Sequence, residues 1–262
     1  MTPLEIDIQP GVHPEWHALG MSFNSDTITC TIVAGVIVVG LGLLLRSRLT
    51  KSSAGHVPSK LQLIWEAVVG QVNKEVENNL GRIHPYVAPL AIALFFFILI
   101  ANWLEMIPTK INEHHDEILT APTADTNLTY ALAILAMVSV WVYGIRTQGP
   151  KAYFGHFLKP YPALAPLEIL TELVKPVTLA LRLFGNIFAG GIMLALIAGL
   201  VAWKIGDVPV GGVLAVLANI LWKLFDMAIG VIQAFIFALL TVLYFAMAGA
   251  GHGGDEHEAE HV

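Results

Sequence analysis

The chain has 262 residues, of which 56% are hydrophobic and only 13% are charged. This composition excludes an ordinary soluble domain and is typical of a protein that crosses a membrane several times. The formal net charge of −6 comes largely from the loops and the C-terminal tail, and we expect no nucleic-acid partner. A single cysteine, Cys30, excludes an intramolecular disulfide, and without a CxxC or Cys/His zinc pattern we expect neither a cofactor nor a metal.

The N-terminal 26 residues contain no lysine or arginine and no basic region followed by an apolar core. They therefore do not resemble a cleavable signal peptide.

Five apolar tracts predict an all-α membrane protein. Residues 27–45 form 19 residues without a charge, enough at about 1.5 Å per residue to cross a hydrocarbon core of roughly 30 Å. Two further spans are predicted at 86–107 and 126–145. The last tracts, 167–202 and 209–250, have 36 and 42 residues. As continuous helices they would reach roughly 54 and 63 Å, so we predict that they are strongly tilted, to near-horizontal.

An amphipathic helix is predicted at 59–81, between the first two spans. Its apolar residues share one helical face: Leu61, Ile64, Trp65, Val68, Val69, Val72, Val76 and Leu80. Ser59 suits the N-cap and Gly81 follows the end. We interpret it as a helix on the cytoplasmic surface of the bilayer, and a partner-binding helix is the alternative.

The distribution of lysine and arginine predicts the orientation. The N-terminal segment holds none, and the connection at 46–85 holds six. The next three connections alternate between poor and rich, with one, three and one. By the positive-inside rule the N-terminus is outside and the tail at 251–262 is cytoplasmic. The whole of 1–262 is then a single membrane domain.

The fourth tract carries a polar stripe. Ionisable residues at mid-bilayer cost about 2.5 to 3.5 kcal/mol on insertion scales, so each needs a reason. At about 100° per residue, Arg182 and five other polar residues fall within about 40° of the direction of Arg182. They are Glu168, Thr171, Lys175, Thr178, Arg182 and Asn186. The stripe predicts a wet path from the cytoplasmic interface to mid-bilayer, although Glu168 and Lys175 could merely snorkel or pair with each other.

Arg182 keeps its charge under ordinary conditions and has no acidic residue after it in its own tract. Its counter-charge must come from another helix or another chain. Small residues flank it: Ala180, Gly185, Ala189, Gly190 and Gly191. They predict a docking face for a carboxylate-bearing partner, with ordinary helix packing as the alternative.

The fifth tract has a second polar face, centred on Asp226. Its other members are Asn219, Gly230, Gln233, Phe237 and Tyr244. Asp226 has two interpretations. It is either the salt-bridge partner of Arg182 or a proton relay, and Lys223 could also pair with it.

Three further polar residues, Glu105, Asp125 and Asn127, are predicted at the outer ends of the second and third spans. They either line an external entrance or simply face water.

Two segments, "KPVTLALRLFGNIFAGG" from Lys175 and "IQAFIFALLTVLY" from Ile232, resemble the signature segments of subunit a of F-type ATP synthases. The segments "VPSKLQLIWEAVVGQV" at 57–72 and "PTADTNLT" at 122–129 also resemble that family. The resemblance covers roughly residues 13 to 250. It implies a proton-translocating stator subunit, packed against a rotating ring of c subunits that carry carboxylates. It also implies b-type stator partners and an energy-transducing plasma membrane.

The resemblance assigns roles to individual residues. It implies that Arg182 is the family's essential arginine, which separates two proton half-channels, and that Asn186 and Gln233 are polar residues near it. Thr178, Lys175 and Glu168 match the cytoplasmic half-channel, and Asp125 and Asn127 match the polar stretch at the outer end of the third span. Two positions depart from the family pattern: Gly191 replaces an acidic residue or histidine, and Asp226 stands where histidine or glutamate is common.

Two other classes of protein fit parts of the same pattern. One is an autonomous ion channel or secondary transporter, in which Arg182 and Asp226 form an internal gate pair. The other is a purely structural membrane scaffold, which the polar stripe disfavours. We expect no catalytic site of its own in this chain, because no GxxxxGK[ST] nucleotide loop occurs.

Overall fold

The computed structural model describes residues 15–18, 21–51, 59–81, 85–104, 125–156, 161–203 and 210–249. Two short strands, β1 (Glu15–Ala18) and β2 (Met21–Asn24), pair as an antiparallel hairpin before the first helix. The hairpin was not predicted, because strands of four residues are too short to show a clear alternation. The rest of the described chain is helical, which confirms the predicted all-α membrane protein.

Five of the described helices are long and apolar enough to cross a membrane, as predicted. They are α1 (Ser25–Lys51), α3 (Val87–Leu104), α4 (Thr126–Gln148), α6 (Ala165–Gly199) and α7 (Gly211–Gly249). A multi-pass membrane protein follows from their length and composition. Glu105 and the tail at 251–262 lie outside the described residues.

Shorter helical segments complete the described chain. They are α2 (Lys60–Leu80), α5 (Pro150–His156) and the 3-10 turns η2 (Pro162–Leu164) and η3 (Leu200–Ala202). The sequence did not predict α5 or η2, because proline and glycine in this connection suggested only a loop.

The predicted caps of α2 are confirmed. The Ser59 side chain accepts a hydrogen bond from the backbone N–H of Gln62 at 3.3 Å. At the other end Gly81 adopts φ 71° and donates its N–H to the carbonyl of Glu77. The two caps satisfy backbone groups that a helix end otherwise leaves without partners.

The apolar face of α2 is only partly covered by protein. Val72 and Val76 are buried, and Trp65 stacks on Phe96 of α3 with 4.0 Å between ring centroids. Ile64 is 61% exposed. This helix therefore packs against α3 and α7 and still leaves apolar side chains uncovered.

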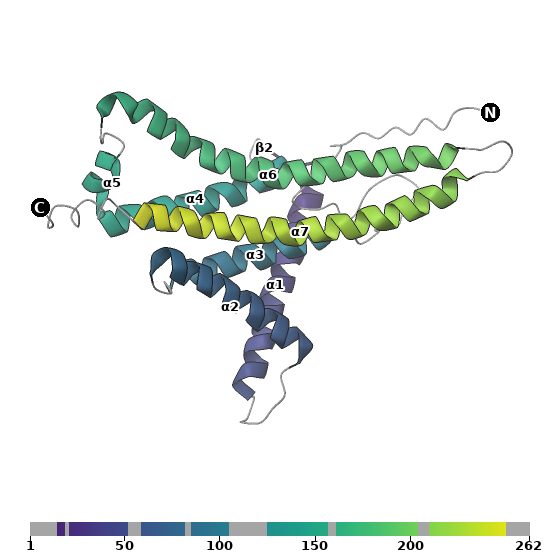
Figure 1. Ribbon diagram of the computed structural model, residues 1–262, viewed down its shortest axis with the longest axis horizontal. Helices are drawn as coiled ribbons and strands as arrows, with labels where there is room; N and C mark the ends of the chain where they lie inside the picture. The colour runs from purple at the N-terminus through teal and green to yellow at the C-terminus, as the bar shows by residue number, and fades with distance from the viewer. Residues whose placement is uncertain are drawn as a thin grey trace, which may run out of the picture.

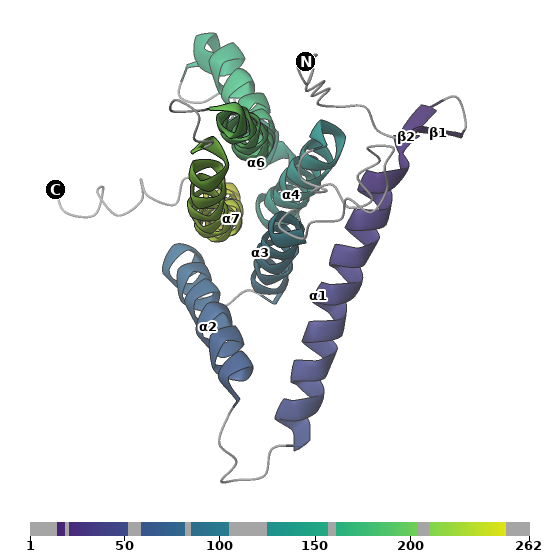
Figure 2. The ribbon, with the colours of Figure 1, turned by 90° about the vertical axis from the view of Figure 1, so that its right-hand side faces the viewer.

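The two longest helices, α6 and α7, run side by side along the longest axis of the molecule, and α1 crosses them at a steep angle (Figure 1). Figure 2 looks along α6 and α7 and shows α1 and α2 extending away from them. Helix α7 packs against α2, α3, α4 and α6 and is the central element of the fold.

The core lies where α7 meets α3, α4 and α6. Phe237 of α7 is fully buried there with Ile98 of α3 and Leu179 of α6. A second cluster surrounds Phe245, whose ring meets the edge of Tyr143 at 5.3 Å between centroids. In a bilayer the alternative to these contacts is lipid, so the buried side chains stabilise the bundle through close van der Waals packing between helices. The structure therefore anchors α7 firmly.

Helix α6 is far less covered than α7. In its apolar stretch 12% of the residues are buried, against 44% in α7. The helix also bends along its course (Figure 1). Pro176 lies inside it and lacks the N–H that would bond to the carbonyl four residues earlier, a common cause of such bends.

Candidate functional site

Arg182 lies on the open side of α6. Its side chain is exposed, and within the described residues it makes no ion pair and no side-chain hydrogen bond. Asn186, one turn further along, is half-buried. A permanent cation on a membrane helix without a counter-charge in the described part of its own chain indicates a partner from outside.

The two threonines of the stripe are exposed, and each hydroxyl donates within α6. Thr171 Oγ1 donates to the carbonyl of Leu167, and Thr178 Oγ1 donates to the carbonyl of Lys175, both at 2.9 Å. The donors are thus occupied by the helix backbone, whereas the hydroxyl lone pairs remain available as acceptors.

Lys175 forms an ion pair that the sequence analysis missed. Its Nζ lies 2.5 Å from Oε2 of Glu172, not beside Glu168. Glu172 was overlooked because, at ten residues before Arg182, it lies about 80° around the helix from Arg182 and outside the stripe. The spacing of three residues from Lys175 is the signal that would have found it.

Glu172 joins α6 to α4 and lies near Tyr153 of α5. Its Oε1 accepts a hydrogen bond from Trp141 Nε1 of α4 at 2.8 Å. Burial, together with the neighbouring Glu172 carboxylate, raises the pKa of the Tyr153 hydroxyl of α5 to about 12. Tyr153 therefore stays uncharged under ordinary conditions and adds no second anion beside Glu172.

Asp226 is half-buried on α7 and faces α6. A Cβ on Gly190 would lie 3.8 Å from Asp226 Oδ1, and within the described ranges the carboxylate makes no ion pair with Arg182. Because Gly190 has no side chain, space remains beside this carboxylate. Asp226 therefore does not neutralise Arg182 in the part of the chain that the structure describes.

Gln233 lies two turns after Asp226 on the same face of α7. Its side chain is 6% exposed, and its Nε2 has no hydrogen-bond partner among the residues that the structure describes. A buried amide donor without a partner is costly, so it marks a place where water or a partner group would bind.

One polar residue next to this face was also missed. Asn102 of α3 is buried and its Nδ2 donates to the carbonyl of Gly230, which lies between Asp226 and Gln233, at 3.4 Å. No sequence pattern pointed to it, because it stands alone in an apolar span.

The small residues of α6 fall on two sides of the helix. Gly185 and Ala189 are exposed on the open side, and no atom lies within 4 Å of a Cβ built on Gly185. Gly190 is buried against α7. The exposed pair lies beside Arg182 and allows close approach of another helix, whereas Gly190 serves the contact with α7.

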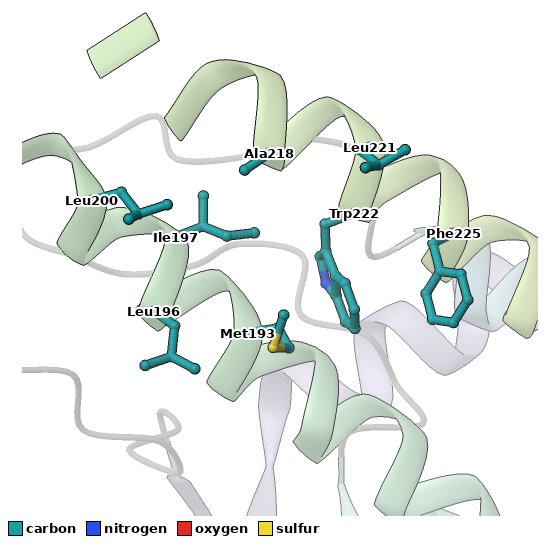
Figure 3. A pocket seen from close by; sticks show the side chains of 8 residues that line it. All are labelled: Met193, Leu196, Ile197, Leu200, Ala218, Leu221, Trp222 and Phe225. Atoms are coloured by element: carbon teal, nitrogen blue, oxygen red, sulfur yellow. The ribbon is translucent and has the colours of Figure 1, made fainter. Parts of the chain in front are cut away.

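A pocket of about 780 Å³ separates α6 from α7 near the end of this helix pair (Figure 3). Its lining residues are Met193, Leu196, Ile197, Leu200, Ala218, Leu221, Trp222 and Phe225. The indole nitrogen of Trp222 is buried and finds no partner in the described part of the chain. An apolar hollow of this kind offers no row of polar groups for a proton.

Asp125 caps a helix at the predicted outer end of the third span. It is 8% exposed, its Oδ1 accepts from the N–H of Asn127 at 2.8 Å, and its Oδ2 accepts from Thr27 Oγ1 at 2.9 Å. Asn127 itself is exposed. Asp125 thus ties α1 to the start of α4.

No set of three histidine, cysteine, aspartate or glutamate side chains could hold a metal ion in the ranges that the structure covers.

Comparison with known proteins decides the family. The model of the family "ATP synthase A chain" matches residues 28–246. This chain belongs to the ATP synthase subunit a family. It is 43% identical to ATP synthase subunit a of Acidothermus cellulolyticus over 98% of this chain and 89% of that protein. It is 41% identical to the Mycobacterium tuberculosis protein over 94% and 96% of the two chains. For the Bacillus pumilus protein the identity is 34% over 87% and 93%.

Proposed function

We propose that this chain is the stator subunit that carries protons to and from a rotating ring of c subunits in an F-type ATP synthase. The surroundings of Arg182 give the main support for the proposal. Arg182 is a fixed, exposed cation on a membrane helix, and no anion of the described chain lies against it. A charge in this position is expensive unless a counter-charge meets it. A carboxylate on a moving partner supplies that charge.

The surface around Arg182 supports a partner that lies against α6. Leu181, Phe188 and Ile192 are 49%, 52% and 48% exposed. A contiguous apolar face of this kind is covered by lipid or by another membrane protein. The exposed Gly185 and Ala189 favour a close helix contact beside the arginine.

The mechanism follows from charge. Arg182 attracts a deprotonated rotor carboxylate and has no such hold on a neutral carboxyl group. The ring therefore passes Arg182 only by releasing a proton on one side and taking one up on the other. The arginine keeps its own proton, so it separates the two routes without conducting.

We assign the two routes to the two polar faces. Glu168, Lys175 and Thr178 form the cytoplasmic route on α6, and Asn186 lies beside Arg182. Asp226 and Gln233 form the outer route on α7, with Asp125, Asn127 and Glu105 proposed as its entrance. An elementary charge that crosses 100 mV releases about 2.3 kcal/mol, so several protons drive each ATP synthesised.

We further propose that the chain lies in the energy-transducing plasma membrane with its N-terminus outside and its C-terminus cytoplasmic. Helices that cross at steep angles cannot all stand upright in one bilayer, so the crossing of α1 with α6 and α7 supports strong tilt of the long pair (Figure 1). The uncovered apolar residues of α2 support a position at the membrane surface. The b-type stator subunits hold the chain in place, and nucleotide chemistry belongs to other subunits.

The alternative of an autonomous channel needs Arg182 and Asp226 as an internal gate pair. Asp226 instead lies beside Gly190, and Arg182 and Asp226 form no ion pair with each other. Reconstitution separates the two functions. The chain in vesicles with the c-ring and the other membrane subunits should conduct protons, whereas the chain alone should not. Selective proton transport by the chain alone would overturn the proposal.

A further inference from the structure

Lys175 belongs to the polar stripe of α6, and Glu172 lies about one turn before it, outside the stripe. Unlike Arg182, Lys175 is neutralised by an ion pair with Glu172. Lys175 Nζ and Glu172 Oε2 are 2.5 Å apart, and the two side chains are only 17% and 19% exposed. The second carboxylate oxygen of Glu172 is held by Trp141 Nε1 at 2.8 Å. Both oxygens therefore have a defined donor, which fixes the carboxylate between α4 and α6.

The surroundings of Lys175 are otherwise poor in anions. Its Nζ lies 5.4 Å from the centroid of the Tyr244 ring of α7. The other titratable neighbour of the pair is Tyr153 of α5, which remains a neutral hydroxyl. Glu172 is thus the group that neutralises Lys175 within the described residues.

The position of Lys175 makes this neutralisation consequential. Lys175 lies seven residues before Arg182 on the same face of α6, about 10 Å along the helix axis. An ammonium group without a counter-charge there would attract a deprotonated rotor carboxylate in the same way as Arg182 does. The ring would then have two places at which its carboxylate is held.

We propose that Glu172 is a positioning residue that neutralises Lys175, so that the rotor carboxylate meets a single unneutralised cation, Arg182, on this face. The inference rests on the proposed function, because it needs a carboxylate-bearing ring that moves past α6. It assigns to Glu172 a part in proton translocation through its charge and not through packing.

Substitution of Glu172 by glutamine separates charge from packing. The glutamine carbonyl still accepts the hydrogen bond from Trp141, but Lys175 loses its counter-charge. In vesicles that hold the whole complex, Glu172→Gln should slow proton-driven ATP synthesis about tenfold per assembled complex, the effect of a modest added barrier. Trp141→Phe removes the hydrogen bond without a change of charge and should have a smaller effect. A larger loss of ATP synthesis in Trp141→Phe than in Glu172→Gln would overturn the inference.

The double variant Glu172→Gln/Lys175→Gln gives the decisive comparison. Because it removes the stray cation, it should synthesise ATP faster than Glu172→Gln alone. If Glu172→Gln fails to assemble and the double variant assembles, the uncompensated cation is again the cause. A double variant no better than Glu172→Gln, or a Glu172→Gln complex at the wild-type rate, would contradict the proposal.

Failure of the proposed function itself has a different signature. It would show as selective proton flux through the wild-type chain reconstituted without the c-ring. That result is independent of how the Glu172 variants behave.

Discussion

The carboxylate of Asp226 on α7 faces Gly190 on α6, where a Cβ would lie 3.8 Å from Oδ1. The distance is an ordinary van der Waals contact, so a methyl group fits and anything larger pushes against the carboxylate. Asp226 is half-buried, so a larger side chain at position 190 would crowd its carboxylate further.

Substitutions at Gly190 should slow proton flux more as the new side chain becomes larger. Gly190→Val places branched carbons against the carboxylate and should slow proton flux in reconstituted vesicles about tenfold, while Gly190→Ala should cost less. Gly199→Val is the matched control, because no atom lies within 4 Å of a Cβ built there. Equal effects of Gly190→Val and Gly199→Val would show that the space beside Asp226 is irrelevant.

Asp226→Asn should slow proton uptake and leave assembly intact. The amide keeps the shape of the side chain but cannot release and rebind a proton as a carboxyl group does. Proton flux and subunit composition of the purified complex are the two measurements. Unchanged flux would favour a purely structural role for Asp226.

Several features of the fold follow from the sequence because they depend on local pattern. Apolar tracts long enough for a bilayer predicted the five spanning helices, and Ser59 and Gly81 predicted the ends of α2. Helical periodicity also placed Arg182 and Lys175 on one face. These properties are set within a few turns of one helix.

Features that join distant segments could not be predicted in this way. Thr27 and Asp125 are 98 residues apart, and Asn102 meets a carbonyl 128 residues away. Periodicity within one helix says nothing about such contacts. Glu172 was within reach, but counting positions from Arg182 directed attention to another face of α6.

The hydrogen bond from Thr27 to Asp125 should contribute to stability. Thr27→Val removes the donor and leaves a buried carboxylate oxygen with one partner fewer, at a cost of about 1 to 3 kcal/mol. Thermal unfolding of the purified complex measures the effect. Thr31→Val serves as control, because its hydroxyl donates only to its own helix at the carbonyl of Thr27. Equal thermal stability of Thr27→Val and Thr31→Val would show that the hydrogen bond from Thr27 to Asp125 does not stabilise the contact between α1 and α4.

Loss of the α2 cap should loosen the first turn of that helix. Ser59→Ala removes the acceptor for the N–H of Gln62 and should cost about 1 kcal/mol of local stability. Hydrogen exchange at Gln62 should accelerate, while exchange near Gly81 stays unchanged. Equal protection of the Gln62 N–H in the wild-type protein and in Ser59→Ala would mean that the cap does not stabilise the first turn of α2.

Replacement of Arg182 tests the central claim most directly. Passive proton flux and proton-driven ATP synthesis are measured together in vesicles that hold the complex with Arg182→Ala. We predict that synthesis is abolished and that the membrane sector leaks protons, because nothing then separates the two routes. A coupled complex that does not leak without this arginine would contradict the account.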